Sequence, residues 1–197
     1  MSIAPVPARP VLADRVLPRS LAVDAALVAG GAALTAGLAQ VAVPLWPVPI
    51  TGQTLAVLLV GASLGALRAT ASMVLYALVG ALGLPVFSDA TGGLAVLGGP
   101  TGGYIVGFVL AAAATGWLAR RRFDRTLLRG LLAFVAGSAV VFAVGLPWLH
   151  AVLGGSWAAT LQGGLYPFVL GGLIKAAIAA LVLRGAWALV DRADARR

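Results

Sequence analysis

The sequence predicts an all-α integral membrane protein with six transmembrane helices and with both termini in the cytoplasm. Hydrophobic residues make up 61% of the 197 residues and charged residues only 10%, whereas about 25% of residues are charged in soluble proteins. The mean hydropathy is +1.02. Apolar runs suited to a hydrocarbon core, which takes about 20 helical residues, alternate with short breaks, and arginines occur in every second break. We therefore expect a multi-pass protein of the cell membrane.

Six apolar runs define the expected helices and a single domain over residues 21–190. Arg68 alone separates the second run from the third, which predicts a tight hairpin, and Pro85 ends the third because proline cannot continue a helix. The expected helices cover residues 21–43, 54–67, 69–84, 103–119, 130–149 and 166 to about 190. Closely spaced alanines on the first helix make a smooth surface on which another helix can lie. They are Ala22, Ala25, Ala26, Ala29, Ala32, Ala33 and Ala36.

The arginines set the expected orientation. Of the fourteen Lys and Arg residues only Lys175 is a lysine, which leaves thirteen arginines. They lie before the first helix, between the second and third, between the fourth and fifth, and at the C-terminal end of the sixth or beyond it, and the three alternate breaks contain none. An excess of arginine marks cytoplasmic loops. We expect residues 1–20, which are rich in proline, to be a flexible cytoplasmic tail and residues 191–197 to be a charged one.

Several functional classes are disfavoured. The chain has no cysteine and one histidine, His150, so neither a metal site nor a cofactor is expected. The formal charge of +8 would suggest a nucleic-acid partner in a soluble domain, but orientation in a membrane explains these arginines. The phosphate-binding pattern G-x-x-x-x-G-K-[ST] is absent, so the chain itself should not hydrolyse ATP. Residues 61–65, GASLG, match the nucleophile elbow of serine hydrolases. An intramembrane hydrolase using Ser63 is one alternative, and a packing face of small residues is the simpler one.

Lys175 is the residue around which the rest of the chain is expected to be arranged. It follows Tyr166 by nine residues, which places it roughly 14 Å along the last helix, close to half of a hydrocarbon core of about 30 Å. An ionisable side chain at this depth marks a functional site and must face protein or a wet cavity. It could instead hold helices together through an ion pair or hydrogen bond, but no acidic residue is expected at its depth.

Two unusual loops are expected on the side away from the arginines. Residues 44–54 contain three prolines and Trp46, and residues 86–102 are rich in glycine and contain Asp89. Loops of this length in a compact domain are often functional. We expect a pocket that opens outward, with Lys175 at its floor and these loops as its roof. In the alternative interpretation the glycines only allow close helix packing, and Thr51 and Gln53 cap the second helix.

Three runs of sequence together resemble the BioY family, the biotin-specific substrate-capture subunits of energy-coupling-factor (ECF) transporters. They are VPITGQTLAVLL (48–59), GLPVFSDATGGLAVLGGPTGGYIVGF (83–108) and YPFVLGGLIKA (166–176). The resemblance implies a six-helix membrane fold that binds biotin near its outer face. It also implies, for many members, a partner module made of a transmembrane coupling protein and two cytoplasmic ATPases. The small-residue face of the first helix would dock on the coupling protein.

The resemblance also implies a set of biotin-binding residues. Polar contacts would come from Lys175, from Asp89 or its neighbour Ser88, and from Gln53 beside Thr51. The pocket wall would be shaped by Thr101, Gly102, Gly103 and Tyr104. Many members carry an acidic residue three positions before the lysine, where this chain has Gly172. Asp89 or a water molecule would then accept the ureido N–H groups.

The chemistry of biotin suits such a site. Biotin has an apolar bicycle and chain, a ureido oxygen and a carboxylate, so one cation and a few polar groups in an apolar pocket suffice. Lys175 could meet either the carboxylate or the ureido end. A sibling hypothesis keeps the architecture and changes the vitamin to thiamine or riboflavin, although a cationic thiamine would sit badly against Lys175.

Overall fold

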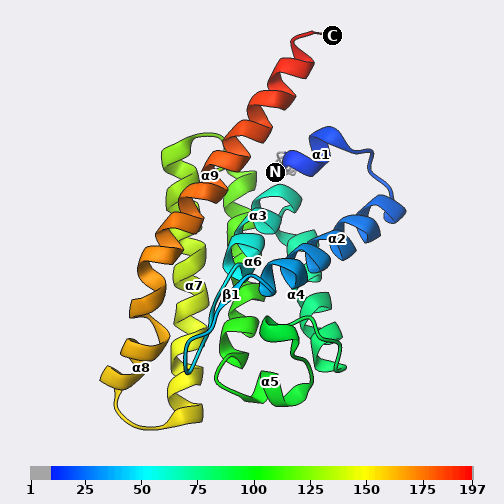
Figure 1. Ribbon diagram of the computed structural model, residues 1–197. Helices are drawn as coiled ribbons and strands as arrows, with labels where there is room; N and C mark the ends of the chain where they lie inside the picture. The colour runs from blue at the N-terminus through cyan, green and yellow to red at the C-terminus, as the bar shows by residue number, and fades with distance from the viewer. Residues whose placement is uncertain (1–9, 197) are drawn as a thin grey trace, which may run out of the picture.

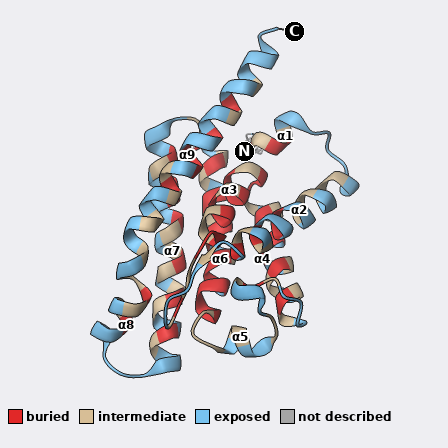
Figure 2. Cartoon of the chain, in the orientation of Figure 1, coloured by how far each residue is buried: buried red, intermediate tan, exposed pale blue. Residues whose placement is uncertain are grey.

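Helix α6 (Gly102–Arg120) lies at the centre of the computed structural model, which describes residues 10–196 (Figure 1). It packs on α3, α4 and α7, and Figure 2 shows it as the most continuously buried of the long helices. In its most apolar stretch 61% of residues are buried, against 17% in α2. The other elements surround this helix. They are α1 (Leu12–Val16), α2 (Leu21–Ala39), α3 (Gln53–Leu64), α4 (Ala66–Ala81), α5 (Leu94–Gly98), α7 (Leu127–Leu153), α8 (Trp157–Gly164), α9 (Tyr166–Asp194), the 3-10 turn η1 (Ser88–Ala90), and strands β1 (Ala42–Val43) and β2 (Ile50–Thr51).

The prediction of a helical membrane protein is confirmed by the length and apolar character of these helices. Within the described residues, four helical stretches could each cross a membrane: α2, α6, α7, and Trp157–Asp194, which joins α8 to α9. Helices α3 and α4 are apolar but shorter. Six helices thus occupy the six expected ranges, while the count of six membrane crossings stays a prediction.

The first expected helix ends earlier than predicted. Helix α2 stops at Ala39, and residues 42–51 form a hairpin in which Ala42 pairs with Thr51 and Val43 with Ile50. Valines are stiff at χ1 and favour extended backbone, and Pro44 disfavours a helical conformation at Val43, the residue before it. The hairpin tip packs on α8, because a Cβ placed on Gly163 would lie 2.7 Å from Cδ of Pro47. The segment predicted as a simple loop therefore lies against another helix.

The turn between α3 and α4 was predicted at Arg68 and lies at Gly65. This glycine has φ 80° and ψ 168°, a conformation that only glycine adopts without strain. Arg68 therefore belongs to the first turn of α4. The loop predicted over residues 86–102 contains η1 and α5. Residues 150–165, which join the fifth and sixth expected helices, contain the end of α7 and all of α8.

Part of the predicted N-terminal tail is folded. Val11 is fully buried among residues of α3, α6, α7 and α9, and α1 packs on α3 and α9. The backbone N–H of Val11 donates to Asp14, which also forms an ion pair with Arg68 at 2.8 Å. The expectation of a loose segment thus fails for residues 11–16, because one apolar side chain and one carboxylate anchor them. Residues 1–9 lie outside the described part of the chain. At the other terminus α9 extends to Asp194, four residues beyond the expected end.

Ion pairs gather at the end of the bundle where α1 and the C-terminus of α9 lie (Figure 1). Arg68 binds Asp14 and also Asp24 of α2 at 2.7 Å, and Arg15 of α1 binds Asp194 of α9. These contacts connect α1, α2, α4 and α9. The arginines identified from the sequence therefore also contribute to holding this end of the bundle together.

Glycines let the helices around α6 approach closely. A Cβ on Gly61 of α3 would lie 1.9 Å from the Thr115 hydroxyl of α6, and a Cβ on Gly107 would lie 3.0 Å from the Val141 backbone of α7. A Cβ on Gly116 would lie 2.4 Å from the Ala66 backbone nitrogen. These positions have no room for a larger side chain unless backbones separate.

We predict that Gly116→Ala lowers the free energy of unfolding by about 1–3 kcal/mol, since the added methyl group meets backbone that cannot rotate away. Thermal unfolding of the purified chain in detergent measures this. Gly185→Ala in α9 is the matched control, because no atom lies within 4 Å of the added carbon and alanine favours a helix over glycine by about 0.5–1 kcal/mol. Equal melting temperatures for the Gly116 variant and the unchanged chain would contradict the packing described.

Candidate functional site

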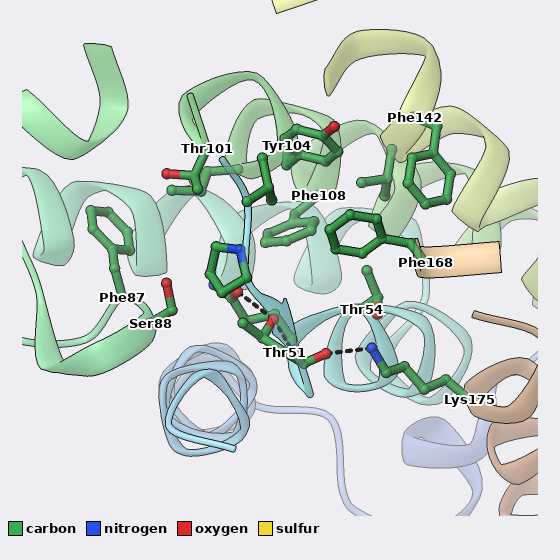
Figure 3. Close-up of a pocket in the computed structure, with 15 residues that line it drawn as sticks. Thr51, Thr54, Phe87, Ser88, Thr101, Tyr104, Phe108, Phe142, Phe168 and Lys175 are labelled. Carbon is green, nitrogen blue, oxygen red and sulfur yellow. Dashed lines mark hydrogen bonds between the residues drawn. The ribbon is translucent and has the colours of Figure 1, made fainter. Parts of the chain in front are cut away.

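A partly enclosed cavity lies between the hairpin, the loop before η1 and helices α3, α6, α7 and α9 (Figure 3). Its free volume is about 50 Å³, which is room for a few water molecules. One part of its lining is polar and the rest is apolar and largely aromatic. The lining residues are Val48, Pro49, Thr51, Gln53, Thr54, Phe87, Ser88, Thr101, Tyr104, Ile105, Phe108, Val141, Phe142, Phe168 and Lys175.

The polar side is a small network at the start of α3. The Thr51 hydroxyl donates to Oε1 of Gln53 at 2.6 Å and accepts from the Gln53 backbone N–H at 3.3 Å. The Gln53 side-chain amide in turn donates to the Tyr76 hydroxyl of α4 at 2.6 Å. All three residues are buried. The Thr51 hydroxyl therefore accepts the first backbone N–H of α3, whereas the Gln53 side chain bonds to Thr51 and Tyr76 and does not cap the helix. Both residues present oriented polar groups to the cavity.

Lys175 reaches the same network from α9. Its Nζ donates to the backbone carbonyl of Thr51 at 2.5 Å, and the contact is marked by a dashed line in Figure 3. None of the ion pairs between described residues includes Lys175. An ammonium has three donors, so the carbonyl satisfies one of them. The positive charge at the cavity has no carboxylate beside it and can attract an electron-rich group of a solute.

The aromatic side consists of Tyr104, Phe142 and Phe168, one each from α6, α7 and α9. The rings of Tyr104 and Phe142 meet edge to face at 6.2 Å, and those of Phe142 and Phe168 lie 6.1 Å apart. Such pairs stabilise one another beyond the area they bury. The Tyr104 hydroxyl donates to the Gly164 carbonyl at 2.9 Å, so this ring also connects α6 to the end of α8. Together the three rings form a firm apolar surface opposite the polar network.

Glycines create the space for Tyr104. A Cβ on Gly145 of α7 would lie 2.6 Å from its ring, and one on Gly164 of α8 would lie 2.6 Å from its hydroxyl. A larger side chain at either position would displace the ring into the cavity. Gly145 and Gly164 therefore influence the cavity indirectly, through the position of the Tyr104 ring that lines it.

The loop that carries Phe87 and Ser88 is fastened by Gln40, the residue that follows α2. Its side-chain N–H donates to the Phe87 carbonyl at 3.0 Å and its side-chain oxygen accepts from the Ala90 backbone N–H at 3.0 Å. Asp89 and Ala90 both have positive φ, 57° and 53°, a region that costs non-glycine residues energy. The Gln40 contacts therefore help to hold this backbone, together with the Phe87 N–H that donates to the Thr91 carbonyl at 3.0 Å.

Six of the nine residues singled out from the sequence line the cavity. They are Thr51, Gln53, Ser88, Thr101, Tyr104 and Lys175. The structure does not bring Asp89, Gly102 and Gly103 into this lining. Asp89 is exposed next to Ser88, a Cβ on Gly102 would collide with the Leu97 carbonyl, and one on Gly103 would lie 2.2 Å from the Trp148 side chain. The two glycines thus serve helix packing.

Sequence reasoning missed most of the apolar lining. Phe108, Val141 and Phe142 lie on long apolar helices where one such residue looks like another. Phe168 lies in the YPF run, and the charge at Lys175 seven positions later was a signal that this face of α9 points inward. Gln40 lies outside the lining and acts through the loop, so neither its type nor its position identified it. Gly172 is also outside the lining, and a Cβ there would meet no atom within 4 Å.

The serine run 61–65 has the features of a packing face. Gly61 lies against Thr115, as described above, and Ser63 lines a shallow groove between α2 and α3. His150 contacts Thr160 at 3.1 Å and stacks on Trp157, at the opposite end of the bundle. Ser63 therefore lacks the adjacent histidine that activates a serine nucleophile. Among the described residues no group of three or more His, Asp or Glu side chains could hold a metal ion.

The sequence of this chain is similar to a known protein family and to several of its members. The sequence pattern of the BioY family matches residues 12–192. "Biotin transporter BioY" of Thermotoga maritima is 40% identical over 144 residues, which cover 73% of this chain and 83% of the relative. "Probable biotin transporter BioY" of Pyrococcus horikoshii is 38% identical over 159 residues, 81% of this chain and 93% of the relative. "Biotin transporter BioY" of Rhizobium etli is 37% identical over 145 residues, 70% and 77% respectively.

A solved structure supports the same assignment at the level of the fold. The crystal structure of the S-component for biotin from an ECF-type ABC transporter superposes with a TM-score of 0.77, covering 85% of this chain and 93% of the other. The two sequences are 24% identical, so this likeness shows a shared arrangement of helices. With the match over residues 12–192, these comparisons confirm the resemblance noted in the sequence, and the chain belongs to the BioY family.

Proposed function

We propose that this chain is the biotin-binding subunit of a biotin uptake transporter and that biotin binds in the Lys175 cavity. The observation that carries the proposal is the pairing of a lone ammonium and a polar network with an aromatic wall in one cavity. The names of the relatives as biotin transporters support the choice of solute. The chain would capture biotin and rely on separate ATPases for energy.

The two sides of the cavity suit the two kinds of surface on biotin. The rings of Tyr104, Phe142 and Phe168 would cover the apolar bicycle and chain. Lys175 would donate to the carboxylate or to the ureido oxygen, both of which accept hydrogen bonds, and charge-assisted bonds of this kind are the stronger ones. Ser88 and Thr101 reach the cavity from the other side and supply hydroxyl groups that both donate and accept. Asp89, with its exposed side chain, would contribute only after its loop moves.

The positive charge of the cavity favours biotin over thiamine. Thiamine carries a permanent positive charge, and the lining contains one ammonium and no carboxylate. Like charges in a partly buried site repel strongly. Riboflavin is neutral, so only its size and hydrogen bonds distinguish it from biotin here.

Biotin would have to widen the cavity. Pockets for small molecules usually span about 300–1,000 Å³, well above the free space present, so lining segments must move when a solute enters. The loop over residues 86–93 is the best candidate, because it carries Phe87 and Ser88 and lies outside the packed helices. Its contacts to other elements include the two Gln40 hydrogen bonds and the Gly93 N–H that donates to the Gly80 carbonyl at 2.7 Å. The tightly packed helices around α6 leave less freedom for movement.

We further propose that the chain lies in the cell membrane with six crossings and with both termini on the cytoplasmic side. The concentration of arginine at one end of the bundle supports this orientation. An ECF coupling protein would dock on α2, whose stretch of small exposed residues is the least buried of the long helices. Ala22, Ala25, Ala26, Ala29 and Ala33 form that exposed surface. Cytoplasmic ATPases would join through the coupling protein.

Equilibrium binding of labelled biotin to the purified chain in detergent tests the function directly. We expect saturable binding that unlabelled biotin displaces and that thiamine and riboflavin do not displace at the same concentration. Displacement by riboflavin alone would change the solute while keeping the site. Absence of saturable binding would overturn the proposal.

Lys175→Met should weaken biotin binding at least tenfold, equivalent to about 1.4 kcal/mol, because it removes the charge and keeps a flexible side chain of similar length. The same binding measurement shows the loss. Ile174→Met is the matched control. Ile174 is the neighbour of Lys175 on α9 and its side chain is 52% exposed, so this variant should bind biotin with the same affinity as the unchanged chain. An unchanged affinity for Lys175→Met would remove the lysine from the site.

Gln40→Met should loosen the loop over residues 86–93, because it removes both hydrogen bonds to Phe87 and Ala90 while keeping the length of the side chain. Hydrogen exchange followed by mass spectrometry should show faster exchange in this loop, and biotin should dissociate several times faster. Gln162→Met in α8, at another exposed glutamine, should leave both rates unchanged. Slow exchange in the Gln40 variant would show that other contacts hold the loop.

A further inference from the structure

A second, larger cavity opens at the arginine-rich end of the bundle, between the turn that joins α6 to α7 and the C-terminal part of α9. Its free volume is about 450 Å³, nine times that of the Lys175 cavity. The lining residues are Arg122, Arg125, Thr126, Arg129, Arg184, Trp187, Ala188 and Asp191. We refer to it as the arginine cleft.

The arginine cleft carries an excess of positive charge. Four guanidinium groups face one carboxylate, Asp191, whose nearest oxygen lies 3.9 Å from Nη1 of Arg125. Counting Asp124 behind Trp187 as well, four positive charges oppose two negative ones and leave +2. Ion pairs between described residues include Arg125 but not Arg122, Arg129 or Arg184. Three guanidinium groups are therefore available to an anion.

Trp187 forms a shelf that orients Arg125. The Arg125 guanidinium lies 3.2 Å from the centroid of the indole ring, and the indole N–H donates to Oδ2 of Asp124 at 2.5 Å. Trp187 is only 3% exposed and Asp124 only 4%. A buried carboxylate thus fixes the ring, and the ring fixes the cation. Arg125 and Trp187 thus form a fixed wall of the cleft beside the three guanidinium groups of Arg122, Arg129 and Arg184.

Arg122 occupies a position that favours glycine. Helix α6 ends with Arg122 N–H donating to the Ala119 carbonyl at 2.8 Å and Phe123 N–H donating to the Leu118 carbonyl at 3.2 Å. This pattern places the first of these residues in the left-handed region, where glycine is usual, and Arg122 has φ 64°. A left-handed conformation costs a side-chain-bearing residue about 1–2 kcal/mol. An arginine that is kept at this cost suggests that its charge has a use.

Exposed apolar side chains lie on both helices within one turn of the cleft arginines. Leu132 follows Arg129 by three residues on α7 and is 55% exposed, and Leu181 precedes Arg184 by three residues on α9 and is 56% exposed. Both helices belong to stretches long enough to cross a membrane. Charge at the end of two such helices, followed by an apolar surface along them, matches the headgroup and the acyl chains of a lipid. A soluble anion would need only the charged part.

We propose that the arginine cleft binds the phosphate of an anionic phospholipid, whose acyl chains lie along α7 and α9. Basic pockets between transmembrane helices bind anionic headgroups in this way. The N-terminus of α7 adds to the attraction, because Thr126 makes no side-chain hydrogen bond to its first turn and the free N–H groups favour an anion. This binding is separate from the capture of biotin at Lys175 and does not depend on it.

Native mass spectrometry of the full chain in an uncharged detergent tests the proposal. We expect dioleoyl phosphatidylglycerol to bind at least tenfold more tightly than dioleoyl phosphatidylcholine, which has the same chains and no net charge. Arg129→Gln and Arg122→Gly should each weaken phosphatidylglycerol binding about fivefold, equivalent to about 1 kcal/mol per arginine near a membrane surface. Arg122→Gly should also leave the melting temperature equal or higher, because glycine relieves the backbone.

Arg121→Gln is the matched control. Arg121 is exposed in the same turn but stacks on Trp117 at 3.7 Å and does not line the cleft, so lipid binding should be unchanged. Equal weakening by Arg121→Gln and Arg129→Gln would reduce the effect to diffuse surface charge and overturn the proposal. Displacement of the lipid by equimolar inorganic phosphate would also overturn it in favour of a free anion. So would cleft variants that bind lipid normally but lose assembly with a partner protein.

Discussion

The contact between the Lys175 ammonium and the Thr51 carbonyl is the interaction on which the candidate site depends. A charge placed among apolar helices is costly unless oxygen atoms meet it, and here the oxygen comes from the backbone of β2. The hairpin that holds this carbonyl is anchored by pairing with Ala42 and by Pro47 against α8. Thr51 then shares its hydroxyl with Gln53, so the cation, the hairpin and the start of α3 form one connected unit.

The aromatic wall, like the helix bundle, depends on close packing that glycines allow. Glycines at the surfaces of α3, α6 and α7 allow backbones to approach, and two further glycines leave room for Tyr104. The ring that contacts Phe142 and Phe168 is therefore positioned by residues that have no side chain of their own. Because the helices are closely packed, we expect the loops rather than the helices to move when a solute enters the site.

Much of the architecture could be predicted because membrane helices leave strong signals in a sequence. Apolar length located the six long elements, arginine placement identified one end of the bundle, and a single lysine indicated the inward face of α9. Helix boundaries are harder to predict. Gly65 ends α3 through its left-handed backbone conformation, but in the sequence it is one more small residue in an apolar run. The hairpin over residues 42–51 is not predicted, because residues 42–43 continue an apolar run typical of a helix and the prolines of residues 44–54 favour a loop, while its strands are only two residues long.

Side-chain partners could be predicted least well. Nothing in the type of Gln40 indicates that it crosses to Phe87 and Ala90, a separation of about fifty positions that only the folded chain closes. The family resemblance implies a contact from Asp89 or its neighbour Ser88, and only Ser88 lines the cavity. Which of two adjacent side chains faces the cavity depends on the turn geometry, which the residue types do not indicate. The aromatic lining was hidden for the opposite reason, because apolar residues on these helices are too common to stand out.

The short helix ahead of α2 has a practical consequence for anyone who shortens the chain. Val11 is completely buried in an apolar cluster that includes Leu58, Ala62 and Leu183, and Asp14 supplies one of the two carboxylates that bind Arg68. Trimming tolerance follows burial and bonding rather than position in the chain. A cut placed just before α2 would remove Val11 and expose the apolar side chains of α3 and α9 in its cluster.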